Sequence, residues 1–128
     1  MAIHIVRLGT PRKKNEGIRI GTVRRPPRGV KKEHLATRDF YDTWLPNLAP
    51  GEELVKQALG AQTDKDWKTF ERRYRAEMKK PESQRILELL ATLSHTTSLA
   101  VGCYCENESR CHRSILRMLL EEKGARVV

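Results

Sequence analysis

The alternation of apolar and polar side chains predicts β-strands near both ends of this chain. From Ile3 to Leu8, and again from Ile18 to Val23, the pattern has a period of two, which is typical of a half-buried strand. Ser98 to Tyr104 is almost wholly apolar, which predicts a central strand covered on both faces. Ala125 to Val128 predicts a short last strand beside it.

Apolar residues recur at intervals of three and four positions, as in a helix, in the middle of the chain and in the segment before its predicted last strand. A short helix follows residues 49–51, and its apolar positions are Leu54, Val55, Ala58 and Leu59. Asp64 to Lys79 is the clearest helix, capped by Thr63 or Asp64, and its core-facing stripe is Trp67, Phe70, Tyr74 and Met78. Pro81 fits the first turn of a third helix, whose predicted buried stripe is Ile86, Leu89, Leu90 and Leu93. Arg110 to Lys123 predicts a fourth helix, capped by Ser109 and ended by Gly124.

These elements together predict the fold class. The 128 residues suit one domain with a single core. We expect an α/β domain over residues 1–128, with a small, mainly parallel central sheet flanked by helices and a C-terminal βαβ unit. Trp44 is expected to pack against the core. The apolar runs are too short to span a bilayer, and the start shows no cationic leader, so we expect a cytoplasmic protein with no membrane partner.

Positive charge is concentrated in the first quarter of the chain. The formal net charge is +9, and residues 1–32 hold ten basic residues against one acidic residue, Glu16. This excess indicates a surface that meets phosphate or another polyanion, although a solvated basic arm fits the same pattern. Helix 64–79 adds a basic face, which fits either a phosphate backbone or solvent and consists of Lys65, Lys68, Arg72, Arg75 and Lys79.

Candidate chemistry lies directly after the predicted central strand. The three cysteines of the chain all occur there, as Cys103, Cys105 and Cys111, followed by His112 and Arg113. In α/β proteins the region beyond the carboxyl end of a strand, at the start of a helix, commonly holds the functional site. There the helix dipole would stabilise a Cys111 thiolate. The alternative is a buried, apolar Cys111 on the stripe of Ile115 and Met118, with Arg113 on the outer stripe of the helix.

The spacing of the thiols bears on several other interpretations. Zinc would draw on Cys103, Cys105, Cys111 and His112, but adjacent Cys111 and His112 are poorly placed to turn both side chains onto one ion. We therefore predict no metal and no cofactor. A reversible disulfide between Cys103 and Cys111 is a further possibility. The Cys-to-Arg spacing of a phosphatase loop is not met between Arg110 and either Cys103 or Cys105, which have six and four intervening residues, and no nucleotide-binding glycine loop occurs.

Residues along the whole chain match one family pattern. They are Gly17, Arg19, Arg24 and residues 27–30, then Trp44, Leu45, residues 48–50, Trp67, Phe70, Arg73, Tyr74 and Glu77, then Cys103 and residues 111–113. On these residues the chain resembles the cysteine-bearing branch of the DUF488 family (domain of unknown function 488), small bacterial and archaeal proteins without an established activity. Many relatives have Asp-Arg-Leu-Trp-Pro-Arg-Gly where residues 23–29 are Val-Arg-Arg-Pro-Pro-Arg-Gly. Because other branches lack the cysteines, the resemblance implies that Arg24 and Arg28 are the more general element.

The predicted function is binding of an anionic, phosphate-like ligand where the loop after Val23 meets the loop after Cys103. The predicted ligand-binding residues are Arg24, Arg28 and Arg113. Cys111 or Cys103 is the candidate nucleophile or redox centre, and His112 is its acid-base partner. The alternative is a nucleic-acid-binding protein that uses the basic N-terminal region and the basic face of helix 64–79. The sequence leaves open whether the protein is an enzyme and how many copies associate.

Overall fold

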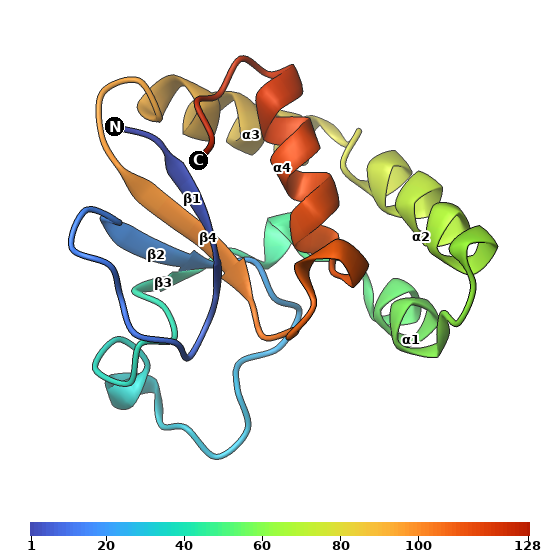
Figure 1. The fold of residues 1–128 in the computed structure, drawn as a ribbon, viewed down its shortest axis with the longest axis horizontal. Coiled ribbons are helices and arrows are strands. Elements are labelled where there is room, and N and C mark those ends of the chain that lie inside the picture. Colours follow the sequence, from blue (N-terminus) through green and yellow to red (C-terminus); the bar gives the residue numbers. More distant parts are fainter.

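A computed structural model describes residues 1–128, with the exception of the side chain of Glu108. Four short strands form a parallel sheet: β1 (Ile3–Arg7), β2 (Ile18–Gly21), β3 (Thr43–Trp44) and β4 (Leu99–Cys103). Their order is β1-β4-β2-β3, so the last strand in sequence lies between β1 and β2 (Figure 1). Every residue of β4 is buried, which confirms the prediction of a central, covered strand.

The helices are α1 (Glu52–Gly60), α2 (Asp64–Glu77), α3 (Pro81–Leu93) and α4 (His112–Glu122). Short 3₁₀ helices lie at Lys32–His34, Pro46–Leu48 and Glu108–Arg110. All four α-helices share one buried apolar cluster with the sheet, to which the strands contribute Ile3, Ile20, Leu99 and Val101. They lie on one side of the sheet (Figure 1). The shared core makes this chain a single α/β domain, as predicted.

The opposite side of the sheet is closed by irregular segments that Arg19 ties together. The Arg19 side chain is buried on β2 and donates to the carbonyl oxygens of Thr10 (2.7 Å) and Asp39 (2.6 Å). It also pairs with the buried carboxylate of Glu16. One side chain thus anchors two loops, which explains how a small sheet with helices on one side still buries its central strand.

The predicted cap of α2 is confirmed. The Thr63 side chain accepts a hydrogen bond from the backbone N–H of Asp66, and the Asp66 carboxylate accepts one from the backbone N–H of Thr63. Phe70, Tyr74 and Met78 of the predicted stripe are buried, while Trp67 packs partly buried against the core.

Two predictions about core side chains are wrong. Trp44 lies on the edge strand β3 and is 42% exposed, while its indole N–H donates to the carbonyl oxygen of Val23 (2.7 Å). The predicted stripe of α3 is confirmed at Leu90, which is buried, and at Ile86 and Leu93, which pack partly buried against the core, but Leu89 is exposed. Ser83, Leu87 and Ala91 are buried instead. The hydroxyl of Ser83 donates to the carbonyl oxygen of Asn47, which places that polar residue against the core.

Three further expectations about the C-terminal part are corrected. Ser109 lies in a 3₁₀ helix, and the residue that precedes the first turn of α4 is Cys111. Arg113 is buried, so it does not belong to a solvent-facing stripe. The last strand is reduced to one bridge between Val127 and Ile3 on the outer edge of β1. It cannot pair with β4, because β1 and β2 already occupy both edges of that strand.

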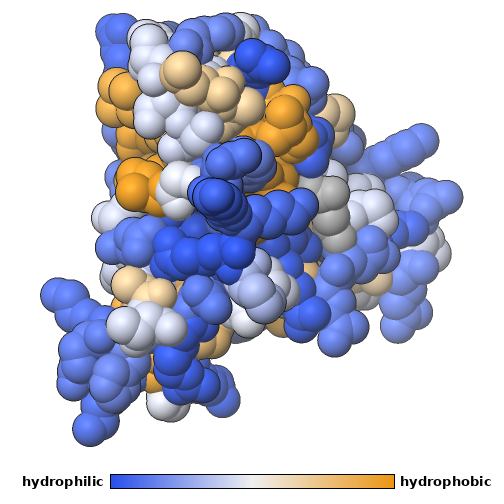
Figure 2. Space-filling view, turned by 60° about the vertical axis from the view of Figure 1, so that its left-hand side comes forward, coloured by the Kyte–Doolittle hydropathy of each residue, from blue (hydrophilic) through white to orange (hydrophobic). Residues whose placement is uncertain are grey.

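The surface is mainly hydrophilic on the face shown in Figure 2, where the hydrophobic patches are small and separate. Much of the N-terminal charge already has a partner: Arg12 pairs with Asp42 (2.7 Å), and Arg19 is buried against Glu16. Lys31 and Lys32 are exposed. None of the helices in the described part of the chain has the length and apolar content that a bilayer span requires.

Candidate functional site

A cleft of about 580 Å³ opens where β2 and β4 end. Its walls come from residues 23–28 after β2, from α1, and from the segment that follows β4. The two loops touch, because the Tyr104 hydroxyl donates to the carbonyl oxygen of Arg25 over 3.2 Å. They meet because β2 and β4 are adjacent parallel strands, whose carboxyl ends lie at the same edge of the sheet.

The walls of the cleft combine apolar side chains with exposed cations. The apolar lining includes Pro26, Pro27, Pro50, Val55, Ala58 and Leu59. Among the cations, Arg25 pairs with Glu52, and Arg110 pairs with Asp64 over 2.6 Å. Arg28 is exposed in the lining and has no ion pair with any described side chain. The positive charge of Arg28 is therefore available to an anion that enters the cleft.

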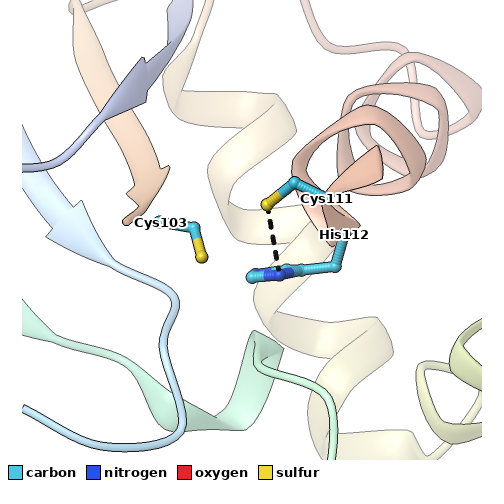
Figure 3. A group of neighbouring side chains, drawn as sticks. All are labelled: Cys103, Cys111 and His112. Atoms are coloured by element: carbon cyan, nitrogen blue, oxygen red, sulfur yellow. Dashed lines mark hydrogen bonds between the residues drawn. The ribbon is translucent and has the colours of Figure 1, made fainter. Parts of the chain in front are cut away.

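Cys103, Cys111 and His112 are buried and line this cleft, and Figure 3 shows their side chains close together between the end of β4 and the start of α4. Cys103 is the last residue of β4, whereas Cys111 has extended backbone (φ −127°, ψ 150°) and His112 begins α4. The change from extended to helical backbone brings the two neighbouring side chains together, so that the Sγ of Cys111 lies 3.8 Å from the Nδ1 of His112. Cys103 and Cys111 also belong to a small buried cluster that contains Leu8 and Val23.

The imidazole of His112 is held in one orientation. Its Nε2 lies 2.7 Å from the carbonyl oxygen of Thr22 and 3.3 Å from the Thr22 hydroxyl, which itself donates to the carbonyl oxygen of Gly102. A carbonyl oxygen only accepts hydrogen bonds, so Nε2 carries the proton and Nδ1 presents its lone pair to Cys111. The Tyr74 ring packs edge-on against the imidazole, with 5.6 Å between ring centroids.

Polar groups converge on the sulfur of Cys111. The buried Arg113 donates through Nε to this sulfur over 3.4 Å and through Nη2 to the carbonyl oxygen of Cys105 over 2.5 Å. Hydrogen bonds from the thiols of Cys103 and Cys105 lower the pKa of Cys111, burial raises it, and His112 lowers it further, so the net pKa lies below the ordinary value. The pKa of Cys103 is raised, because its thiol is a hydrogen-bond donor to Cys105 and Cys111 and is buried. Among the three thiols, the surroundings of Cys111 therefore favour ionisation most.

The three predicted ligand-binding arginines have different surroundings. Arg28 is exposed in the cleft. Arg24 also lines the cleft, but its Nε and Nη2 donate to three carbonyl oxygens, those of Pro46, Ala49 and Pro50, at 3.0 to 3.1 Å. Arg24 thus fastens the loop after β2 to the segment before α1. Arg113 is directed at Cys111 and Cys105, so the structure brings it to the sulfurs and not to the cleft lining.

Two contributors to this site were missed from the sequence. Thr22 orients His112. The sequence signal for this role is weak, because it consists only of a polar residue directly after β2, the strand next to β4. Helix α1 supplies an apolar wall through Val55 and Leu59, the latter 79% exposed. An exposed apolar side chain on a short helix can be recognised as part of a cleft wall only when the positions of the neighbouring loops are known.

Comparisons with known proteins agree with this architecture. A family model described as the active DUF488-N3 subclade matches residues 3–124. "Uncharacterized protein YeaO" from Escherichia coli (strain K12) is 30% identical over 116 residues, which cover 91% of this chain and 94% of that protein. No solved structure matches the chain significantly.

Proposed function

Since this chain belongs to the DUF488 family, and the subclade it matches is described as active, we propose that it is an enzyme with an anionic, phosphate-like substrate. The cleft would hold this substrate, and Cys111 would be the nucleophile. The observation that carries the proposal is the chain of contacts from Cys111 Sγ to His112 Nδ1 (3.8 Å) and from His112 Nε2 to the Thr22 carbonyl oxygen (2.7 Å). A nucleophile, its base and a group that orients the base form the arrangement that covalent catalysis requires.

Each residue of this arrangement has a separate task in the proposed reaction. Nδ1 of His112 takes the thiol proton, while the Thr22 carbonyl oxygen holds the ring and stabilises its protonated form. Arg113 stabilises the thiolate through the hydrogen bond from its Nε. The thiolate bonds to the electrophilic atom of the substrate as the bond to the leaving group breaks, and the leaving group takes the proton from His112. Water then releases the adduct and restores the thiol.

Substrate recognition would depend on Arg28 and on the apolar walls. Arg28 supplies an uncompensated charge in the cleft, and Arg24, already fixed by three carbonyl oxygens, lines the same wall. Pro27 and Leu59 suit the non-polar part of a substrate that carries an anionic group. Three free thiols suit a reducing compartment, and we place the protein in the cytoplasm.

Thiol labelling tests the proposed nucleophile. Metal-free, reduced protein is treated with limiting iodoacetamide, and the labelled peptides are identified by mass spectrometry. Cys111 is 2% exposed and Cys103 is 8% exposed, so exposure alone predicts faster labelling of Cys103. The contacts with His112 and Arg113 predict the reverse order. Labelling of Cys103 at least as fast as Cys111 would refute the nucleophile.

Thermal protection tests the anion site. Inorganic phosphate should raise the melting temperature of the wild-type protein, and Arg28→Ala should reduce this rise. Arg85→Ala is the matched control, because Arg85 is 83% exposed on α3, pairs only with Glu88 among the described residues and does not line the cleft. Equal protection of the two variants would indicate nonspecific attraction to a basic protein.

Nucleic-acid binding is the alternative, and a second hollow favours it. A groove of about 770 Å³ between α2 and α4 is lined by Lys68, Arg72 and Lys79, while its Arg75 is held by Glu71 and Glu122 and its Lys123 pairs with Glu88 over 3.8 Å. A DNA or RNA oligonucleotide titrated at two salt concentrations serves as a further arm of the phosphate experiment. Affinity that falls steeply with salt and is lost in Arg72→Ala, but not in Arg28→Ala, would favour this alternative.

A further inference from the structure

The sulfur and nitrogen atoms that line the cleft are also potential ligands of a metal ion. The two sulfurs of Cys103 and Cys111 and a ring nitrogen of His112 all lie within 4.8 Å of one another. A third sulfur, that of Cys105, lies 3.8 Å from the sulfur of Cys103. Thiolate and imidazole are the ligands that structural zinc sites use, commonly as three cysteines and one histidine. We propose that Cys103, Cys105, Cys111 and His112 form a binding site for one Zn²⁺ ion.

Two of the separations between these atoms match tetrahedral coordination. With Zn–S bonds of about 2.3 Å, two sulfurs on one ion lie about 3.8 Å apart, and a sulfur and a nitrogen lie about 3.6 Å apart. The sulfurs of Cys103 and Cys105 are 3.8 Å apart, and Cys111 Sγ is 3.8 Å from His112 Nδ1. The widest separation in the buried trio, 4.8 Å, needs a contraction of about 1 Å, which rotation of a side chain can supply.

The sequence argument against zinc does not hold for this backbone. Adjacent residues in a regular helix point about 100° apart, which would keep Cys111 and His112 from one ion. The boundary of α4 falls between them, however, and both side chains reach the same space between the end of β4 and the start of the helix (Figure 3). The prediction of no metal rested on this spacing, and the geometry removes that reason.

The surroundings of the cluster also suit a metal ion. A histidine that binds metal through one ring nitrogen usually donates its other N–H to a carbonyl oxygen or a carboxylate. His112 has this second contact, from Nε2 to the Thr22 carbonyl oxygen. Three thiolates and a neutral imidazole on Zn²⁺ carry one net negative charge, which the guanidinium of Arg113, 3.4 Å from the Cys111 sulfur, would balance.

A zinc ion at this place would regulate the proposed reaction. The metal and the electrophile compete for the same electron pair on Cys111, so the zinc-loaded protein would be the resting form and the metal-free protein the reactive form. The metal site stands on the geometry alone, whereas its regulatory effect rests on the proposed function.

Zinc titration of the full-length chain tests the site. Reduced protein, stripped with a chelator, is titrated with Zn²⁺ against a competing chelator, and bound metal is counted by elemental analysis. We expect one zinc per chain. His112→Gln should lose more than the roughly 100-fold in affinity that an outer-shell substitution costs. The matched control is His34→Gln, because His34 is exposed on a 3₁₀ helix outside the cleft lining, and it should bind like the wild type.

A measurement on the wild-type protein covers the case in which a variant does not fold. Stoichiometric Zn²⁺ should slow iodoacetamide labelling of all three cysteines, including the exposed Cys105, and Mg²⁺ should not. Zinc binding that is absent, equal in His112→Gln and His34→Gln, or without effect on labelling would overturn the site. Loss of thiols without bound metal would indicate a disulfide and would also overturn it.

The two proposals fail in different ways. If zinc does not bind while Cys111 of the metal-free protein is still labelled before Cys103, the metal site is wrong and the nucleophile stands. If zinc binds while metal-free Cys111 shows no preference over Cys103, the nucleophile is wrong and the metal site stands. The Cys105→Ser variant distinguishes a zinc site with three protein ligands from one with four. Unchanged zinc affinity in this variant would show that Cys105 is not a ligand.

Discussion

Removing the charge of Glu16 is expected to destabilise the fold by about 3 kcal/mol. The side chains of Glu16 and Arg19 are each 1% exposed. The Glu16 carboxylate accepts hydrogen bonds from the Arg19 guanidinium and from the backbone N–H of Lys13 (3.0 Å). Glu16→Gln keeps the size of the side chain but leaves the buried guanidinium without a counter-charge.

The expected loss in the free energy of unfolding depends on the hydrogen bonds that Arg19 keeps in the Glu16→Gln variant. Breaking a buried ion pair from one side typically costs about 3–5 kcal/mol. Arg19 keeps the carbonyl oxygens of Thr10, Pro11 and Asp39 as acceptors, which places the expected loss at the lower end of that range. Urea unfolding followed by circular dichroism measures it. The control is Glu52→Gln, whose exposed pair with Arg25 should contribute less than about 1 kcal/mol. A Glu16→Gln loss no larger than that of the control would refute the reasoning.

The same pair predicts acid lability. Burial raises the pKa of Glu16, but the hydrogen bonds from Arg19 and Lys13 outweigh it, so the folded-state pKa lies below the ordinary value of 4.5. A carboxyl group with a lowered pKa stabilises the fold above its unfolded-state pKa, and this contribution is lost as the pH falls through the folded-state value. Wild-type stability should therefore fall below about pH 4.5, and the fall should be shallower in Glu16→Gln. Parallel curves would contradict this assignment.

Three further substitutions test the backbone and the core by urea unfolding. Gly17 and Gly29 have φ angles of +80° and +75°, but a Cβ on Gly17 would lie 2.0 Å from the carbonyl oxygen of Ser98, whereas a Cβ on Gly29 meets no atom within 4 Å. Gly29→Ala should cost about 1–2 kcal/mol and Gly17→Ala clearly more, and equal losses would contradict the contact. Tyr74→Phe removes a buried hydrogen bond to the carbonyl oxygen of Leu48 (2.6 Å) and should cost about 1–3 kcal/mol without changing the labelling order of the cysteines. A changed order would mean that this hydroxyl also positions the site.

The fold class could be predicted because local patterns were strong where the core is formed. Leu99 to Cys103 is apolar at nearly every position and became the central strand, and Thr63 with Asp66 supplied a cap for α2. The errors arose where long-range contacts decide the outcome. Residues 125–128 have the composition of a strand, but both sides of the central strand β4 are already paired, so this segment only bridges the outer edge of β1. Ser83 of α3 is buried with a hydrogen bond to the distant carbonyl oxygen of Asn47, a contact that helical periodicity does not contain.

The candidate site lies at boundaries between elements, and this is why sequence patterns located it but did not describe it. Thr22 comes directly after β2, Cys103 ends β4, and Cys111 precedes the first turn of α4. Regular periods predict how side chains diverge within a strand or a helix, but at such a boundary the backbone direction changes within one residue. The position of β4 between β1 and β2 then brings the end of β2 next to the end of β4. Thr22 thereby contacts a histidine ninety positions away, and adjacent Cys111 and His112 face each other.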